Sequence, residues 1–234
     1  MIFRVVHTVF FYIITIVSFL VGTTVIIPLV FFSRSKHKSF QFSAHLWARF
    51  LSFFSGVKVK VSGRENLPKN TTVIYAANHQ GMADILIVLA CLPAGFRFAV
   101  KSELFKVPLF GWYLKRAGYF SIDRKLILSA YRTVETIVEI IKAGESVLIF
   151  PEGTRSKTGE LGRFKRGSLL AALKSGAPII PIAISGSFNI LPRGSWLINP
   201  TPVKLSVGQP IRIETEADYD TKVAEVREAI EQML

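Results

Sequence analysis

The chain has 234 residues, of which 50% are hydrophobic, and it carries 29 Lys and Arg against 16 Asp and Glu, a formal net charge of +13. This length fits one α/β domain with one appended segment better than two full domains, and the charge favours anionic partners. The single cysteine, Cys91, excludes an intrachain disulfide and a thiolate metal cluster, so we expect a reducing compartment.

The chain begins with a long apolar stretch. Residues 5–32 contain no Asp, Glu, Lys or Arg, and about 20 such residues in a helix are enough to cross the hydrocarbon core of a bilayer. A cleaved signal peptide is a weaker interpretation, because the stretch is long for one and no clear small-residue cleavage site follows it. The sequence therefore predicts a membrane-associated helix.

A basic turn at residues 33–38 leads into a second predicted helix. Residues 40–54 place aromatic and aliphatic side chains at helical spacing, which indicates an amphipathic helix too short to span a bilayer. Residues 1–56 are thus predicted to form a membrane-associated segment that either spans the bilayer or makes a hairpin in one leaflet. Its cations are mixed with Phe, Ile, Val and Leu, which is typical of contact with anionic lipid. We expect membrane lipid, and no nucleic acid, as a partner.

Residues 57–234 alternate strand-like and helix-like patterns. This order predicts an α/β fold with a mostly parallel or mixed sheet flanked by helices. The predicted strands are 57–61, 72–76, 96–100, 118–122, 147–150, 179–184 and 203–207, and the predicted helices include 127–141, 169–174 and 219–234.

His79 is the only histidine in this second part, and it directly follows a predicted strand. Asp84 lies five residues later, and on one continuous helix five steps of about 100° would point the two side chains apart. With His79 in a loop and Asp84 in the first helical turn, the carboxylate can accept a hydrogen bond from one ring nitrogen and leave the other as a base. The alternative is a structural histidine beside an N-capping aspartate.

A second polar turn follows the predicted strand 147–150. It contains Glu152 and Arg155. A guanidinium suits a phosphate because it can donate two parallel hydrogen bonds, and the carboxylate can accept from a substrate hydroxyl. An ordinary Pro-Gly turn with solvated charges is the alternative.

Other cations stand singly at the ends of predicted elements. Lys101 and Arg124 each follow a predicted strand, and residues 164–167 are expected to open a helix whose backbone N–H groups would favour an anion. Each of these cations alone is more often a surface charge.

Four segments resemble, in order and spacing, the motifs of the glycerolipid acyltransferases. The first has the pattern Asn-His-x4-Asp with His79 and Asp84, and the third reads Phe-Pro-Glu-Gly-Thr-Arg-Ser. The first and third are highly specific together. The four segments are residues 78–84, 118–124, 150–156 and 177–181.

The resemblance implies that His79 removes the proton of an acceptor hydroxyl and that Asp84 orients His79. It also implies a substrate-binding set for a glycerol phosphate, and it places Pro181 on the acyl or donor side. The substrate-binding set is Lys101, Arg124, Glu152, Gly153, Thr154 and Arg155.

The reaction implied is transfer of a fatty acyl group from a thioester donor to the sn-2 hydroxyl of 1-acyl-sn-glycerol-3-phosphate (lysophosphatidate), giving phosphatidic acid. The donor is acyl-CoA or an acyl carrier protein, and backbone N–H groups near Gly81 are candidates to bind the oxyanion. We expect no metal and no cofactor, and a catalytic domain, residues 57–234, at the cytoplasmic side of the cell (inner) membrane. The alternatives are another lysophospholipid or a lyso-aminolipid as acceptor, and an inactive lipid-binding relative.

Overall fold

A seven-stranded sheet forms the centre of the computed structural model, which describes residues 1–33, 35–122, 127–192 and 194–234. The strand order is β1-β7-β6-β2-β5-β3-β4, and every neighbouring pair is parallel except β6 with β7. The predicted α/β fold with a mixed sheet is therefore confirmed. The strands are β1 (Val59–Ser62), β2 (Ile74–Ala77), β3 (Phe96–Lys101), β4 (Phe120–Ile122), β5 (Ser146–Ile149), β6 (Ile179–Ser185) and β7 (Val203–Val207).

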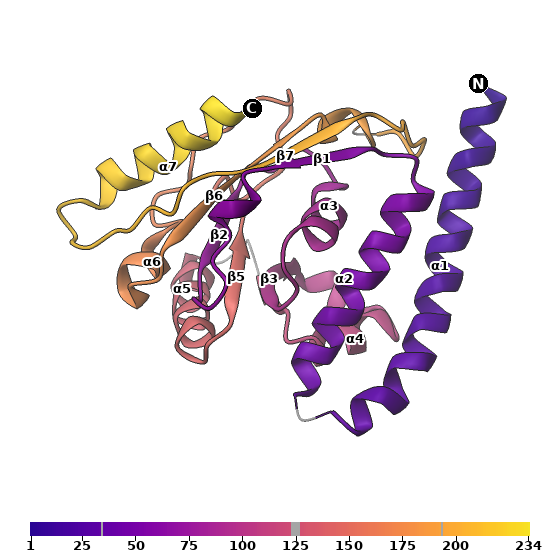
Figure 1. Cartoon of the computed structure of the whole chain (residues 1–234), viewed down its shortest axis with the longest axis horizontal. Coiled ribbons are helices and arrows are strands. Elements are labelled where there is room, and N and C mark those ends of the chain that lie inside the picture. Colours follow the sequence, from indigo (N-terminus) through magenta and orange to yellow (C-terminus); the bar gives the residue numbers. More distant parts are fainter. Residues whose placement is uncertain (34, 123–126, 193) are drawn as a thin grey trace.

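Helices cover both faces of the sheet (Figure 1). One face packs against α5 (Ile127–Lys142), α6 (Leu170–Ser175) and α7 (Tyr219–Met233). The other packs against α3 (Asp84–Cys91), α4 (Phe110–Arg116) and the amino-terminal helices. Side chains alternate along a strand, so β6, which is buried from Ile179 to Ile184, contributes to the hydrophobic core on each face of the sheet. Three short 3-10 helices complete the fold: η1 (Arg64–Asn66), η2 (Ser102–Lys106) and η3 (Ser187–Asn189).

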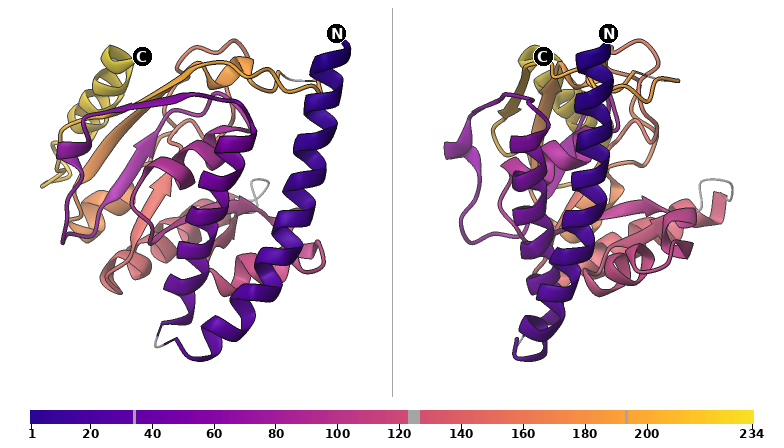
Figure 2. Two further views of the ribbon diagram at one scale, coloured as in Figure 1. Left: turned by 45° about the vertical axis from the view of Figure 1, so that its right-hand side comes forward. Right: turned by 90° about the vertical axis from the view of Figure 1, so that its right-hand side faces the viewer.

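The first two helices form an antiparallel pair, α1 (Ile2–Phe31) and α2 (Lys36–Phe54), at one side of the sheet. Figure 2 shows α1 as the outermost element, with α2 between it and the sheet. The segment Ile2–Pro28 is long and apolar enough to cross a membrane, and only 11% of its most apolar window is buried in the protein. This composition indicates membrane association.

Two glycines explain where the observed elements differ from the predicted ones. The helix expected to open at residues 164–167 begins at Leu170, and the strand expected from residue 118 begins at Phe120. Gly167 has φ +78° and Gly118 has φ +75°. A residue in this left-handed region ends regular helix or strand geometry, so each element starts after its glycine.

Candidate active site

Three parallel strands bring polar residues that are far apart in the sequence to one edge of the sheet. β5 lies between β2 and β3, and the chain leaves the carboxyl ends of these strands at Asn78, Phe150 and Ser102. Ligands of open α/β sheets bind at such carboxyl ends. His79, Glu152 and Lys101 therefore come from neighbouring strands although they are far apart in the sequence.

His79 and Asp84 are in direct contact. His79 Nδ1 lies 2.7 Å from Asp84 Oδ2, and Asp84 is the first residue of α3, so a turn separates the pair. The Gly81 N–H donates to the same carboxylate oxygen at 2.8 Å. Asp84 is fully buried, whereas 12% of the His79 side chain is exposed. With Nδ1–H donating to the carboxylate, Nε2 is left as the nitrogen that can accept a proton.

The hydrogen bond of Gly81 corrects one expectation. Its N–H was a candidate to bind an oxyanion, but it is occupied by Asp84. A carboxylate that is fully buried needs hydrogen bonds from the protein, and the tight turn between His79 and α3 supplies this one.

The turn after β5 holds His79 from three directions. The His79 ring stacks on Phe150 with centroids 4.0 Å apart and planes inclined by 19°. The His79 N–H donates to Glu152 Oε1 at 2.7 Å, and the His79 carbonyl accepts from the Ser156 N–H at 2.7 Å. The first and third motifs, at residues 78–84 and 150–156, are thus in direct contact. Their spacing along the sequence does not reveal this.

Glu152 is buried and both of its carboxylate oxygens accept backbone N–H groups. Oε1 accepts from His79 and Oε2 from Gly162, at 2.9 Å. Burial raises the pKa of the Glu152 carboxyl, while the N–H groups of His79 and Gly162 oppose the rise. A Cβ on Gly162 would lie 2.6 Å from Glu152 Oε2, so this approach requires glycine. The geometry indicates that Glu152 positions His79, and a direct contact with substrate stays a prediction.

Asn78 fixes the end of the strand that carries His79. It is fully buried, its side-chain amide donates to the Ile184 carbonyl at 2.8 Å, and its side-chain oxygen accepts the Ile184 N–H at 2.7 Å. This pair of bonds ties β2 to β6 one residue before His79. This structural role of Asn78 was not predicted from the sequence. Its position directly before His79 could have indicated it.

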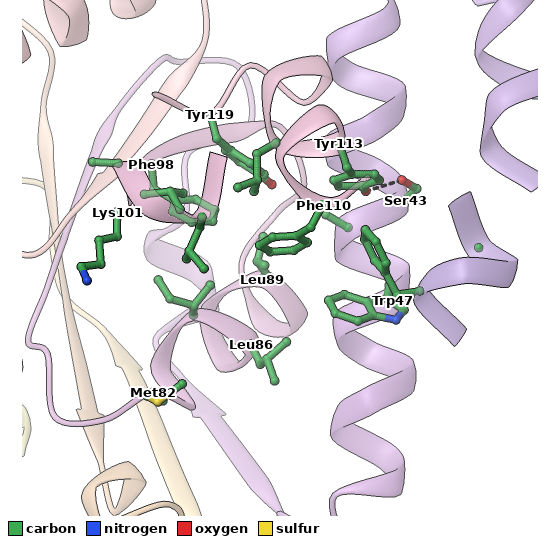
Figure 3. A pocket seen from close by; sticks show the side chains of 18 of the residues that line it. Ser43, Trp47, Met82, Leu86, Leu89, Phe98, Lys101, Phe110, Tyr113 and Tyr119 are labelled. Atoms are coloured by element: carbon green, nitrogen blue, oxygen red, sulfur yellow. Dashed lines mark hydrogen bonds between the residues drawn. The ribbon is translucent and has the colours of Figure 1, made fainter. Parts of the chain in front are cut away.

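An apolar cavity of about 530 Å³ extends from His79 toward the amino-terminal helices. Figure 3 shows Lys101 and Met82 toward one end and Trp47 and Ser43 toward the other, with Phe110 between them. Its polar lining near the sheet edge includes His79, Lys101 and Arg155, and most other lining side chains are apolar. These come from α1, α2, α3, α4 and β3.

The remaining predicted substrate-binding residues are distributed around this end. Lys101 is largely exposed and its ammonium lies 3.2 Å from Glu103. Gly153 and the exposed Thr154 form the turn after β5, where Gly153 has φ +69°. Arg124 lies outside the described residues. The structure thus brings Lys101 and Arg155 to the cavity that His79 lines.

Pro181 faces away from the cavity at His79. It is in the middle of β6, and a Cβ on Gly208 would contact both Pro181 and Met233 of α7. Since side chains alternate along a strand, Pro181 faces the α7 side, whereas Ile180 and Ile182 face the core on the cavity side. Pro181 itself therefore does not line this cavity, and the assignment of its segment to the acyl or donor side stays a prediction.

Comparisons with known proteins find a matching family model, similar sequences and a similar structure. The family model Acyltransferase matches residues 58–185. A chloroplastic 1-acyl-sn-glycerol-3-phosphate acyltransferase of Brassica napus is 37% identical over 182 residues, which are 77% of this chain and 52% of the relative, so the chain spans about half the length of that relative. A 1-acyl-sn-glycerol-3-phosphate acyltransferase of Pseudomonas aeruginosa is 32% identical, covering 90% of this chain and 82% of that one. The crystal structure of the 1-acyl-sn-glycerophosphate acyltransferase PlsC from Thermotoga maritima matches with a TM-score of 0.86 and 28% identity, over 99% of this chain and 94% of that one.

Proposed function

Because the chain belongs to the acyltransferase family, we propose that it moves a fatty acyl group from a thioester donor to the sn-2 hydroxyl of 1-acyl-sn-glycerol-3-phosphate. The product is phosphatidic acid, a phospholipid precursor. The observation that carries the proposal is that His79, oriented by Asp84, lines the polar end of a long apolar cavity together with Lys101 and Arg155. A base, two cations and an apolar cavity match a hydroxyl, a phosphate and an acyl chain.

The His79 Nε2 atom acts as general base. It accepts the hydroxyl proton while the hydroxyl oxygen attacks the thioester carbonyl carbon, and Asp84 stabilises the imidazolium that forms. When the tetrahedral intermediate collapses, the C–S bond breaks and His79 returns the proton to the leaving sulfur. One ester bond forms as one thioester bond breaks, without an acyl-enzyme.

Lys101 and Arg155 bind the phosphate of the acceptor, with Arg124, Gly153 and Thr154 as further ligands. The cavity volume of about 530 Å³ falls within the range of about 300–1,000 Å³ that is usual for small-molecule sites. The apolar lining suits the acyl chain of the donor, which is acyl-CoA or an acyl carrier protein. Both donors are anionic, in keeping with the basic protein.

The chain acts at the cytoplasmic face of the cell (inner) membrane, with α1 lying in one leaflet. Four hydrogen bonds along α1 support this in-plane arrangement. Arg4 donates to the carbonyls of Leu197 and Ile198 at 3.2 and 3.3 Å, and Tyr12 donates to the Trp196 carbonyl at 2.9 Å. Farther along α1, Ser18 accepts from the Trp47 ring nitrogen at 2.9 Å. A helix held to the protein at its start and middle is not free to cross the bilayer alone.

Product analysis tests the function. The purified protein is incubated with lysophosphatidate and a labelled acyl donor, either acyl-CoA or acyl carrier protein, and the lipids are separated. We expect phosphatidic acid with the wild type and a 10²–10⁴-fold lower turnover with His79→Ala, about the effect of removing a positioned base. Lipid affinity without ester formation would indicate an inactive lipid-binding relative, and activity only on other lysolipids would reassign the acceptor.

A further inference from the structure

The second helix has three faces, and the polar one is not used by the reaction. Residues of α2 that point into the protein include Phe40, Ala44, Ala48 and Leu51. A row of exposed apolar side chains lies on the opposite side, with exposed fractions of 41–80%: Phe42, Leu46, Phe50 and Phe53. At about 100° per residue, His45, Arg49 and Ser52 form a narrow strip between these two faces. An amphipathic helix in a membrane surface has this arrangement, with its polar strip at the depth of the headgroups.

A separate cavity of about 430 Å³ opens along this polar strip. It lies between α2, the carboxyl end of α3, β1 and η1, and it shares no lining residue with the cavity at His79. Its lining includes His45, Arg49, Arg64 and the thiol-bearing Cys91. Phe53, which is 80% exposed, also lines it, so the cavity is continuous with the apolar row of α2.

Two positive charges converge on this cavity without a protein counter-ion. The side chains of Arg49 and Arg64 make no hydrogen bond or ion pair with any residue that the structure describes. Both lie close enough to Cys91 for their charges to oppose the rise that burial causes in the pKa of its thiol. His45 donates through Nδ1 to the Leu89 carbonyl at 2.7 Å, which orients its ring at the same site. Unpaired guanidiniums of this kind bind phosphate through paired hydrogen bonds.

We propose that Arg49 and Arg64 form a binding site for the phosphate of an anionic phospholipid headgroup, distinct from the substrate site. The acyl chains of the bound lipid lie along the apolar row Phe42–Phe53 of α2. A soluble phosphate compound would gain nothing from this row, whereas a lipid in the same leaflet contacts both the cations and the exposed rings. The site therefore fixes the depth and rotation of the protein at the membrane surface, independently of acyl transfer.

Vesicle binding tests the site with matched variants. Wild type, Arg49→Gln/Arg64→Gln and Lys58→Gln/Lys60→Gln are compared for binding to phosphatidylcholine vesicles with and without phosphatidylglycerol. Both double variants lose two charges, but Lys58 and Lys60 alternate with Val57, Val59 and Val61, which line the cavity, and so point away from it. We expect the arginine variant to lose roughly 5-fold in affinity per arginine, about 1 kcal/mol each, on anionic vesicles only. Equal losses in the two variants would mean a delocalised charge effect and overturn the proposal.

The natural Cys91 reports occupation of the cavity directly. Its labelling rate by a small thiol reagent is measured with and without phosphatidylglycerol vesicles, and the ratio is compared within each variant. We expect protection in the wild type and in the lysine variant, and none in the arginine variant. If inorganic phosphate or glycerol phosphate protects Cys91 as well as vesicles do, the site takes a soluble anion and the lipid assignment is wrong. Unchanged turnover of the arginine variant on detergent-dissolved lysophosphatidate shows that this variant is folded. The vesicle-binding and labelling results are then independent of the proposed acyl transfer.

Discussion

Every polar atom that orients His79 comes from a group that is itself held by the fold. Asp84 is fully buried at the start of α3, and Glu152 is buried after β5. The imidazole is therefore held at Nδ1 by a carboxylate and on one ring face by Phe150, and Nε2 is the ring nitrogen that Asp84 does not occupy. Such positioning fixes the tautomer before substrate arrives, so no reorganisation is needed when the proton moves.

Asp84→Asn should lower kcat and leave KM for the acceptor nearly unchanged. The amide keeps the shape of the carboxylate but removes the negative charge that stabilises the imidazolium, and Asp84, being fully buried, does not contact substrate. We expect a loss of about 10²–10⁴-fold in kcat, comparable to the loss of the base. Steady-state kinetics of the single variants and of Asp84→Asn/His79→Ala check this. Additive losses would mean that the two residues do not act as a unit.

Glu152→Gln should lower both the stability of the protein and its kcat. A glutamine amide would present its own N–H₂ to one of the two backbone donors, either His79 or Gly162, and leave that donor unpaired. An unsatisfied buried donor costs about 1–3 kcal/mol, so we expect a lower free energy of unfolding together with reduced kcat. Glu160→Gln, on an exposed residue of the same loop, is the control. A raised KM with unchanged stability would show instead that Glu152 contacts the substrate.

The helices and strands that could be predicted are those whose apolar pattern and end signals lie within one short stretch of sequence. The helix α5 was predictable because its apolar stripe is 16 residues long and ends before Gly144, and β6 because an apolar run follows Gly176 and Pro178. The short α4 carries Gly111 in its first turn and has no such stripe. The same limit applies to the site. The pair His79 and Asp84 could be predicted because the two residues are close in the sequence. The cavity walls and the hydrogen bond between Glu152 and His79 could not, because they join residues many positions apart.

A partly buried ion pair at the other end of the strands should make stability depend on pH. Arg97 of β3 donates through Nε to Glu145 at 2.7 Å, and Gln41 of α2 donates to the same carboxylate at 3.2 Å. Burial raises the pKa of Glu145, but the hydrogen bonds from Arg97 and Gln41, together with the charges of Arg97 and His37, outweigh it and hold the pKa below its usual range. The unfolded chain therefore binds this proton at higher pH, so the stabilisation is complete above about pH 4.3 and is lost as the pH falls through the lowered pKa.

Glu145→Gln should accordingly reduce the free energy of unfolding at pH 7 by about 1.5–3 kcal/mol, the usual range for a hydrogen bond to a charged group. It should also flatten the acid decline of stability below about pH 5. Urea unfolding at several pH values measures both effects. Glu231→Gln, which removes an exposed pair with Arg227 on α7, should change neither by a measurable amount. An unchanged acid decline in Glu145→Gln would show that other carboxyls dominate it.

The helix α1 also lines the cavity at His79. A larger side chain at Gly22 would shorten this cavity. Gly22 lines the cavity, and a Cβ built on it meets no other heavy atom within 4 Å. Gly22→Leu should therefore fill part of the cavity without strain, and shift the preferred donor toward shorter acyl chains. Turnover on a series of acyl-CoA chain lengths measures the shift, with Gly22→Ala as the small-volume control. An unchanged chain-length profile would place the donor chain elsewhere.

At the scale of the whole molecule, α1 and α2 form a layer along one side of the sheet (Figure 2). The exposed side of α1 is apolar along its length, while its other side contributes Phe19 to a cluster of rings with Trp47, Phe110 and Tyr113. The cavity walls from this layer meet His79, Lys101 and Arg155 from the sheet edge at one site. With the in-plane arrangement of the two helices proposed above, a lipid substrate reaches His79 from the leaflet in which they lie.

The in-plane arrangement of α1 predicts that both of its ends stay on one side of the bilayer. In a Cys91→Ser background, Ile2→Cys and Ser35→Cys place single thiols at the two ends, both at exposed positions. The protein is added to preformed sealed vesicles and treated with a membrane-impermeant maleimide. Since the start of α1 is tied to the loop at Trp196–Ile198 and its far end returns to the sheet through α2, both thiols should react equally with and without detergent. A helix that crosses the bilayer would carry one end inside the vesicle, where it reacts only after detergent is added.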